Sequence, residues 1–329
     1  MAQVTDEGPQ IAVDDEISDY EPSVRDVVSE TSSISSSIHK HRVENGRRYH
    51  AYKDGAYWGP NDEKAQDALD LAHHTYSMAM DRKLYLAPLD SPEKVLDIGT
   101  GTGIWALDFA DEHPTAQIIG TDLSPIQPSW IPPNVTFQID DATEYPWTFA
   151  PATFDYIHVR DMYGSIPDWE KFLRQCYTSL KPGGYLEVHN TAVWFECDDD
   201  TLPADADHAL RRWGPIFRAA GDKLGKSTTI SETQSSVMSG AGFVDVTERK
   251  FKRPVGTWPK DPVLKELGKY YQLECLQGCE GWALAFLTRL MGWQVDEVQT
   301  FLDQVRAGVV NRRLHVYVPF VVSVGRKSV

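Results

Sequence analysis

A glycine-rich loop is the feature of the chain with the clearest chemical use. The segment DIGTGTG (residues 97–103) follows a short apolar run and precedes a stretch with helical periodicity. Glycines in such a turn adopt positive φ and let a ligand approach the backbone closely. The spacing is G-x-G-x-G, and Ile104 stands where a dinucleotide fingerprint has its third glycine. Asp97 disfavours a diphosphate and favours a ligand that carries an ammonium or sulfonium group.

Acidic residues follow the next two apolar segments along the chain. Asp122 comes after the first, where a carboxylate can accept both hydroxyls of a ribose. Asp140, Asp141 and Ala142 come after the second, where an adenine amino group would lie. Ligands of parallel sheets bind at the carboxyl ends of the strands. Each acid alone is also explained as a cap or a solvated loop residue, but their order and spacing favour a ligand site.

The spacing of apolar residues predicts the elements that position these groups. Strands are expected at 94–98, 117–120, 135–139, 154–159, 185–189 and 243–246, and helices over 65–76, from 104, through 172–180 and over 206–220. Strands alternating with helices indicate an α/β fold with a parallel sheet covered on both faces. Residues 262–306 are expected to be mostly helical, and 315–324 to form a last strand. Pro319 within that strand favours an edge position or a bulge.

Composition excludes several classes of protein. The chain has 329 residues and a net charge of −16, which argues against direct binding of nucleic acid. No apolar run reaches the ~20 residues needed to span a bilayer, and the N-terminus lacks the features of a signal peptide. We therefore expect an intracellular protein, cytoplasmic or nuclear, without integral membrane association. Cys275 and Cys279 lack a second pair of metal-ligating residues, so buried free thiols are expected instead of a metal site.

The negative charge is concentrated at the N-terminus. Residues 1–39 hold nine acidic residues against Arg25 alone. We expect residues 1–42 to be a disordered acidic arm, either a solubilising tail or a docking or phosphorylation segment. Residues 43–329 are expected to form the folded domain, with an N-terminal helical lid over 43–90 and a helical insertion over 190–228.

Four segments carry a family resemblance. VLDIGTGTGIW, IIGTDLSPIQPSWIPPNV, FDYIHVRDMYGSIPDW and LKPGGYLEVHN resemble the class I S-adenosylmethionine-dependent methyltransferases. More narrowly, they resemble the fungal LaeA-like methyltransferases, which include velvet-associated regulators of secondary metabolism. The resemblance covers roughly residues 44–325. It implies a Rossmann-like, seven-stranded and mostly parallel sheet whose last strand is antiparallel.

The resemblance also implies which residues hold the cofactor, S-adenosylmethionine. Its methionine end would lie on the glycine loop, its ribose and adenine on the acidic residues, and its sulfonium near the fourth strand. The residues implied are Asp97, Gly99, Thr100, Gly101, Gly103, Asp122, Leu123, Asp140, Asp141, Ala142, Val159 and Arg160, with Asp140 and Asp141 as rivals for one role.

Residues for catalysis and for substrate binding are less specified. Methyl transfer from a sulfonium needs alignment and exclusion of water, and a general base only where the acceptor loses a proton. His158, Asp161 and His189 are candidates for that base, and packing is the alternative for each histidine. An aromatic lid or substrate wall is expected from Tyr49, Tyr52, Tyr57, Trp58 and Tyr163, with plain core packing as the alternative.

These observations favour an S-adenosylmethionine-dependent methyltransferase that acts on a small metabolite or on a protein side chain. By resemblance, the enzyme would regulate secondary metabolism or development, with a velvet-type regulatory protein as partner. The alternative is a partner-binding regulatory protein that keeps the fold with little or no turnover. The apolar helix around Trp282, Phe286, Leu290 and Trp293 is then either core or a partner surface.

Overall fold

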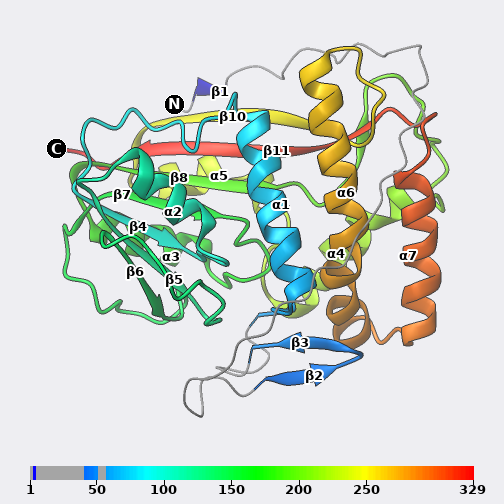
Figure 1. Ribbon diagram of the computed structural model, residues 1–329, viewed down its shortest axis with the longest axis horizontal. Coiled ribbons are helices and arrows are strands. Elements are labelled where there is room, and N and C mark those ends of the chain that lie inside the picture. Colours follow the sequence, from blue (N-terminus) through cyan, green and yellow to red (C-terminus); the bar gives the residue numbers. More distant parts are fainter. Residues whose placement is uncertain (1–2, 5–40, 51–56) are drawn as a thin grey trace.

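A mixed β-sheet runs through the centre of the protein (Figure 1). The computed structural model describes Gln3–Val4, residues 41–50 and residues 57–329. The strands of the sheet are β1 (Gln3–Val4), β4 (Lys94–Ile98), β5 (Gln117–Asp122), β6 (Val135–Ile139), β7 (Phe154–Arg160), β8 (Leu180–Thr191), β9 (Glu196–Cys197), β10 (Val244–Pro254) and β11 (Val316–Arg326). Most of the predicted acidic arm and Tyr52 lie outside the described residues; Gln3–Val4 pair with β10.

Strand order identifies the fold. The order is β1-β10-β11-β8-β7-β4-β5-β6, with β9 beside β11. The pairs among β4 to β8 are parallel, and β11 runs antiparallel to both of its long neighbours. Without the two-residue strands β1 and β9, this is the expected sheet of seven strands with an antiparallel last strand. The carboxyl ends of β4, β5 and β7 meet at one edge, where the glycine loop begins.

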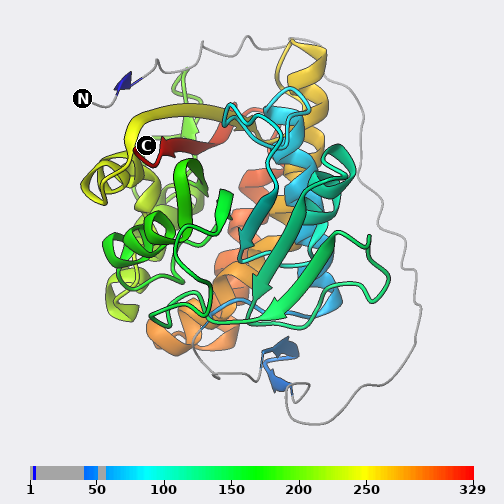
Figure 2. The same cartoon turned by 90° about the vertical axis from the view of Figure 1, so that its left-hand side faces the viewer.

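Helices cover both faces of the sheet. α1 (Glu63–Ala79) and α2 (Ile104–Glu112) pack on one face through Tyr76 and Phe109, and α3 (Trp169–Ser179) and α5 (Gln234–Gly240) pack on the other through Phe172 and Met238. Figure 2 shows these two layers on opposite sides of the strands. Asp62 caps α1 by accepting a hydrogen bond from the N–H of Ala65 at 3.1 Å.

A second group of helices stands beside α1. It consists of α4 (Ala209–Leu224), α6 (Pro262–Ala285), the π-helical turn η2 (Phe286–Leu290) and α7 (Val295–Val309). These helices form a separate hydrophobic cluster that includes Phe286. The apolar segment around Phe286, predicted as either core or a partner surface, is therefore part of the core. α6 packs along α1 (Figure 1). A short 3-10 turn, η1 (Ile230–Glu232), precedes α5, and none of the described helices is both long and apolar enough to cross a membrane.

Two expectations are wrong in detail. A helical lid was expected over 43–90, but the described residues there include a hairpin, β2 (Arg42–Glu44) and β3 (Arg47–Tyr49), which precedes the helix α1. Pro319 lies in an interior strand, since β11 has neighbours on both sides. The carbonyl of Pro319 accepts a hydrogen bond from the N–H of Ala192, just after the end of β8. The nitrogen of Pro319 points to the same side, into the gap between the end of β8 and the start of β9. A residue without an N–H is tolerated there because neither strand pairs with Pro319.

Glu187 fixes the connection between α1 and β4 to the middle of the sheet. Its buried carboxylate accepts hydrogen bonds from the backbone N–H groups of Leu86, at 2.9 Å, and Ala87, at 2.7 Å, and from Nε2 of His189 at 2.6 Å. Burial alone would raise the pKa of Glu187, but the bond from His189 and the other donors hold it below its usual value. The carboxylate is therefore ionised and paired at neutral pH.

We expect Glu187→Leu to lower the free energy of unfolding by about 3–5 kcal/mol, because it leaves buried donors without an acceptor. Glu187→Gln should cost less, about 1–2 kcal/mol, because its amide oxygen still accepts. The measurement is guanidinium unfolding at pH 7.5. Glu170→Gln, at an exposed pair on α3, is the control and should change little. Equal effects of Glu187→Leu and Glu170→Gln would contradict this role.

Candidate functional site

The three loop glycines are required for three different reasons. All have positive φ, at 71° for Gly99, 57° for Gly101 and 83° for Gly103. A Cβ on Gly99 would lie 2.3 Å from Sδ of Met162, and one on Gly103 would lie 2.4 Å from the ring of Phe137. A Cβ on Gly101 would meet only the tip of Leu69, at 3.4 Å. Gly101 is therefore required for its backbone conformation alone, and the other two also allow close packing.

Asp97 holds the loop from beneath. Its carboxylate accepts hydrogen bonds from Oγ1 of Thr100 at 2.6 Å and from Nδ1 of His158 at 2.7 Å. The ring of His158 stacks on Trp105, with 3.8 Å between centroids. Burial raises the pKa of Asp97 to about 6 and lowers the pKa of His158 well below its usual value. Both carboxylate oxygens are thus used inside the protein, and the neutral imidazole donates to one of them.

Asp122 lies at the end of β5, beside the loop. One carboxylate oxygen accepts from the N–H of Gly101 and the other from the N–H of Ser124, each at 2.9 Å. Burial raises the pKa of Asp122 to about 6 despite these two bonds. Each oxygen keeps a lone pair for a second donor. The geometry can therefore accept two neighbouring hydroxyl groups.

The two neighbouring acids after β6, Asp140 and Asp141, differ in burial and in hydrogen-bond partners. The carboxylate of Asp141 is buried and accepts from the N–H and the hydroxyl of Thr143, at 2.8 and 2.7 Å. Asp140 is half-buried and accepts from the N–H of Asp141. Both residues line the same cavity as Asp122.

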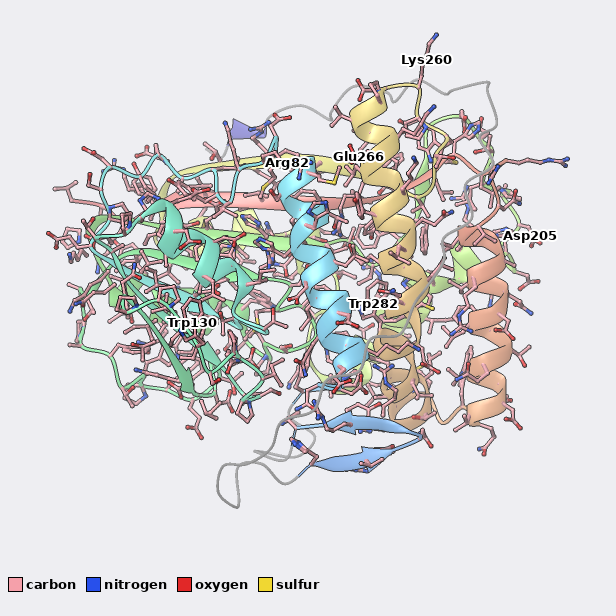
Figure 3. All side chains as sticks on the ribbon, in the orientation of Figure 1. Arg82, Trp130, Asp205, Lys260, Glu266 and Trp282 are labelled. Carbon is pink, nitrogen blue, oxygen red and sulfur yellow. The ribbon has the colours of Figure 1, made fainter. Side chains whose placement is uncertain are left out.

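That cavity is continuous from the glycine loop to the helices beyond α1. It has a volume of about 230 Å³ and runs between α1 and α6. Beyond α1 its wall is mainly aromatic and aliphatic, and we call this end the aromatic chamber. The chamber is lined by Trp194, Phe195, Trp213, Phe217, Tyr271, Cys275, Cys279, Trp282, Val305, Val309 and Val318. Trp282, labelled in Figure 3, comes from α6.

A buried arginine stands behind the wall between the two ends. Arg253 of β10 is 1% exposed, and its guanidinium lies over the rings of Tyr76 and Tyr271, at 4.6 and 4.2 Å from their centroids. It donates to the hydroxyls of Thr75, at 3.3 Å, and Thr191, at 2.8 Å. Burial alone would lower the pKa of Arg253, but the surrounding anionic and phenolic groups raise it, so the guanidinium stays charged.

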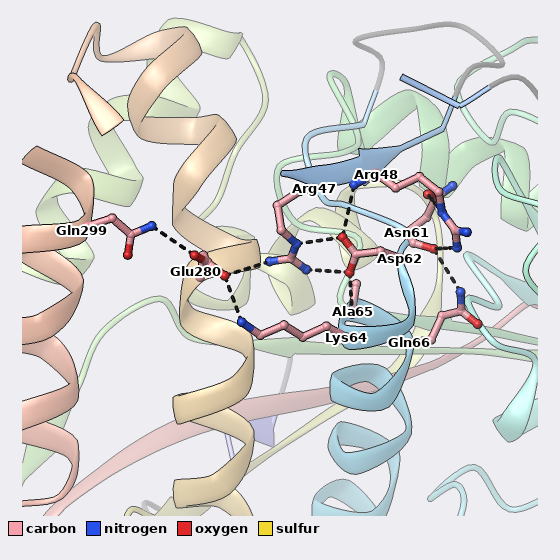
Figure 4. Close-up of polar contacts among 9 residues, drawn as sticks. All are labelled: Arg47, Arg48, Asn61, Asp62, Lys64, Ala65, Gln66, Glu280 and Gln299. Atoms are coloured by element: carbon pink, nitrogen blue, oxygen red, sulfur yellow. Dashed lines mark hydrogen bonds and ion pairs between the residues drawn. The ribbon is translucent and has the colours of Figure 1, made fainter. Parts of the chain in front are cut away.

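A second arginine closes the end of the cavity beneath the β2–β3 hairpin. Arg47 of β3 donates two hydrogen bonds to Asp62, at 2.7 and 2.8 Å, and its Nη1 lies 3.5 Å from Oε2 of Glu280 on α6 (Figure 4). Lys64 of α1 contacts the same oxygen of Glu280 at 2.9 Å. The hairpin, the start of α1 and the end of α6 are therefore joined by one group of charges.

Most of the residues implied for the cofactor line the cavity. Those that do are Gly99, Thr100, Gly101, Asp122, Leu123, Asp140, Asp141, Ala142 and Arg160. Asp97, Gly103 and Val159 do not, and each for a physical reason. Asp97 bonds to the loop from beneath, Gly103 packs on Phe137, and Val159 is buried in the hydrophobic cluster on the α3 side of the sheet.

Some of the residues predicted for catalysis and for the lid also line the cavity, and others are buried away from it. Asp161 lines the cavity, whereas His158 and His189 are buried beneath it in bonds to Asp97 and Glu187. Among the aromatic residues, Tyr57, Trp58 and Tyr163 line the cavity. Tyr49 is buried in β3 beneath the guanidinium of Arg289, 4.4 Å from its ring centroid.

Glu274 and the aromatic residues of the β8–β9 connection and of α4 were not predicted from the sequence. A signal for Glu274 exists, because it is a carboxylate in the apolar stripe of α6 formed by Tyr271, Cys275 and Cys279. Within the described residues no cluster of three or more side chains has the makeup of a metal site. Cys275 and Cys279 are buried free thiols in the cavity wall.

Comparisons with known proteins agree with this geometry. Residues 71–248 match the family model described as a methyltransferase domain. Methyltransferase pytC of Aspergillus terreus is 43% identical over 92% of this chain and 93% of its own length. The secondary metabolism regulator LAE1 of Cochliobolus heterostrophus is 36% identical over 84% of this chain and 91% of its own. The regulator laeA of Aspergillus flavus is 32% identical, over 88% and 78%.

The family match covers more than half of the chain, and the relatives are similar over most of their lengths. The order of the sheet strands and the glycine loop at the end of β4 agree with that match. The protein is thus a methyltransferase and belongs to the LaeA-like group of the class I family.

Proposed function

We propose that this methyltransferase binds S-adenosylmethionine on the glycine loop and Asp122, and transfers the methyl group to a small, largely apolar molecule in the aromatic chamber. The observation that carries the proposal is the single cavity that joins these two places. A donor at one end and an acceptor at the other would meet inside the protein. A protein side chain as acceptor would have to reach past the hairpin and Arg47 instead.

The residues at the glycine-loop end fit this cofactor. Gly101 lines the cavity without a side chain, and Asp122 offers two oxygens spaced for the hydroxyls of a ribose. Three polar atoms of cavity-lining side chains are buried without a hydrogen-bond partner among the described residues: Nη1 of Arg47, Nε1 of Trp58 and Oγ of Ser165. Buried donors and acceptors of this kind are usually satisfied, so they support the binding of a polar ligand.

The task of the protein in this reaction is alignment. When bound, S-adenosylmethionine supplies a methyl group on a positively charged sulfur, which is already activated for displacement. Asp122 would fix the nucleoside, and Tyr57, Trp58 and Tyr163 would cover the cavity and exclude water. The aromatic chamber would hold the acceptor in line with the methyl group.

Calorimetric titration with S-adenosylmethionine and with S-adenosylhomocysteine tests the first half of the proposal. Micromolar binding supports it and justifies a screen of small acceptors with labelled methyl groups. No binding to a folded sample would contradict it.

The names of the relatives favour a second candidate. Relatives at 29–36% identity are named secondary metabolism regulators. This supports a regulatory role through a partner, for example a velvet-type protein, with little turnover. Turnover separates the two candidates: methylated product from small acceptors favours the enzyme, and cofactor binding without any product favours the regulator.

We expect Asp122→Ala to weaken binding of S-adenosylhomocysteine at least about tenfold, which corresponds to ~1.4 kcal/mol. The reason is the loss of both acceptors for the ribose. Glu266→Gln, an exposed change on α6, is the matched control and should bind as the unmodified protein does (Figure 3). Unchanged affinity of Asp122→Ala in calorimetry would refute the assignment.

We also expect the affinity for S-adenosylhomocysteine to fall as the pH drops below 6. The pKa of Asp122 is about 6, and protonation removes its charge and one of its acceptor positions. The dissociation constant should then be about tenfold larger at pH 5 than at pH 7. Asp122→Asn should bind more weakly at pH 7 and show a flatter profile. An equally steep profile in this variant would assign the dependence to another group.

A further inference from the structure

Glu274 is a buried carboxylate that faces the reaction cavity. It lies in the middle of α6, is 4% exposed and lines the cavity together with Tyr271 and Cys275 of the same helix. Burial keeps both of these neighbours on α6 uncharged, because it raises the pKa of Tyr271 and of Cys275 well above the usual values. An acidic side chain in such a place lowers stability unless it has partners or a use.

The two oxygens of Glu274 have different surroundings. Oε2 accepts a hydrogen bond from the hydroxyl of Thr75 at 2.7 Å. Arg253 approaches Oε1 with its Nη1 at 3.8 Å, which is an ion pair but longer than a hydrogen bond. No described residue donates a hydrogen bond to Oε1. One oxygen is thus fixed by the protein, and the other can meet a hydroxyl group from the cavity.

Hydrogen bonds connect Glu274 with Asp161 near the glycine loop. Asp161 accepts from the hydroxyl of Tyr76 at 2.9 Å, and that hydroxyl is 2.7 Å from Oγ1 of Thr191. Arg253 then bridges Thr191 and Thr75, which donates to Glu274. Asp161 also adjoins Met162, whose sulfur packs on Gly99. The wall that holds Glu274 is therefore continuous with the place where the methyl group is expected.

Charged and titratable groups surround Glu274 on every side. Arg253 comes from β10, Arg160 and Asp161 from the end of β7, and Tyr76 from α1. Tyr271 and Cys275 come from α6 itself, and Tyr163 lies after β7. Burial raises the pKa of Glu274 to about 7, while Arg253 and Thr75 oppose the rise. A general base works best when its pKa is close to the working pH.

We propose that Glu274 is a catalytic residue that accepts the proton from a hydroxyl group of a flat, apolar acceptor as that oxygen is methylated. The inference rests on the proposed function and adds to it a base and a substrate class.

The step balances as follows. The acceptor oxygen forms a bond to the methyl carbon, the carbon–sulfur bond breaks, and its electron pair stays on sulfur to give the thioether. The hydroxyl proton goes to Oε1 of Glu274 and leaves to water when the cavity opens after the reaction. No oxidant, reductant or metal is needed.

The surroundings favour a neutral hydroxyl over an amine. Arg253 already balances the charge of Glu274, so a cationic acceptor would gain little at this wall. The chamber around Glu274 is lined by Trp194, Trp213 and Phe217, and these aromatic side chains suit an apolar, aromatic molecule.

2-Naphthol serves as the probe, with S-adenosylmethionine as donor. The full-length protein should form 2-methoxynaphthalene at a rate that rises with pH through about 7, the pKa of Glu274. Glu274→Gln keeps the acceptor for Thr75 but cannot take the proton. It should lose at least about 100-fold in kcat with little change in KM and lose the pH dependence. Glu274→Asp should recover part of the rate with a pH dependence, and Glu266→Gln should match the unmodified protein.

Binding measurements separate the possible failures. Calorimetry with S-adenosylhomocysteine tests folding and the cofactor site, and fluorescence titration of 2-naphthol in its presence tests the chamber. If S-adenosylhomocysteine does not bind the unmodified protein, the proposed function fails. If it binds but 2-naphthol is neither bound nor methylated, the substrate class is wrong. If Glu274→Gln methylates 2-naphthol as fast as the unmodified protein, the role of Glu274 is wrong.

Discussion

The geometry of the cavity depends on the burial of the Arg253 guanidinium. A charge removed from water is costly unless its surroundings replace the water, and here two aromatic rings and two hydroxyls do so. These partners come from α1, α6 and β8, so the charge can be satisfied only when all three meet β10. A lysine could not replace Arg253. The planar guanidinium stacks on aromatic rings with its faces and at the same time donates hydrogen bonds in its own plane, and an ammonium group cannot do both. The arginine thus sets how far α1 and α6 stand from the sheet.

The α1–α6 pair is held at two levels. Arg253 acts between Thr75 and Glu274, and Arg47 acts between Asp62 and Glu280. Going from Asp62 to Thr75 along α1 corresponds to going back from Glu280 to Glu274 along α6, so the two helices run antiparallel. The cavity passes between these two levels. Both arginines are buried, but the acids beside Arg47 are about one-fifth exposed, whereas Glu274 beside Arg253 is buried. Motion that admits a ligand is therefore easier at the hairpin, where the charges can exchange partners with water.

Local patterns were enough to predict the sheet and the glycine loop. A strand, a tight turn and a helix follow from neighbours in sequence, which is why β4, the glycine loop and α2 were predicted correctly. The direction in which a side chain points depends on the packing around it, which a motif does not contain. Asp97 and Val159 belong to motifs predicted to bind the cofactor, but their side chains face the interior of the protein. Glu274, Arg253 and Thr191 meet only because β8, β10 and α6 are brought together by the fold, and no short-range pattern contains that contact. Pro319 was misplaced for the same reason, since the change of neighbour from β8 to β9 is a property of the sheet.

The charges give the two ends of one cavity different preferences. Around the glycine loop, Asp122, Asp140 and Asp141 line the cavity against Arg160 and Lys226, so the balance is negative and suits a cationic sulfonium. At the other end Glu274 faces Arg253, and the chamber beyond is apolar, which suits a neutral molecule. A cationic methyl donor would therefore bind at the acidic end of the cavity and a neutral acceptor at the apolar end. The two would meet near Asp161.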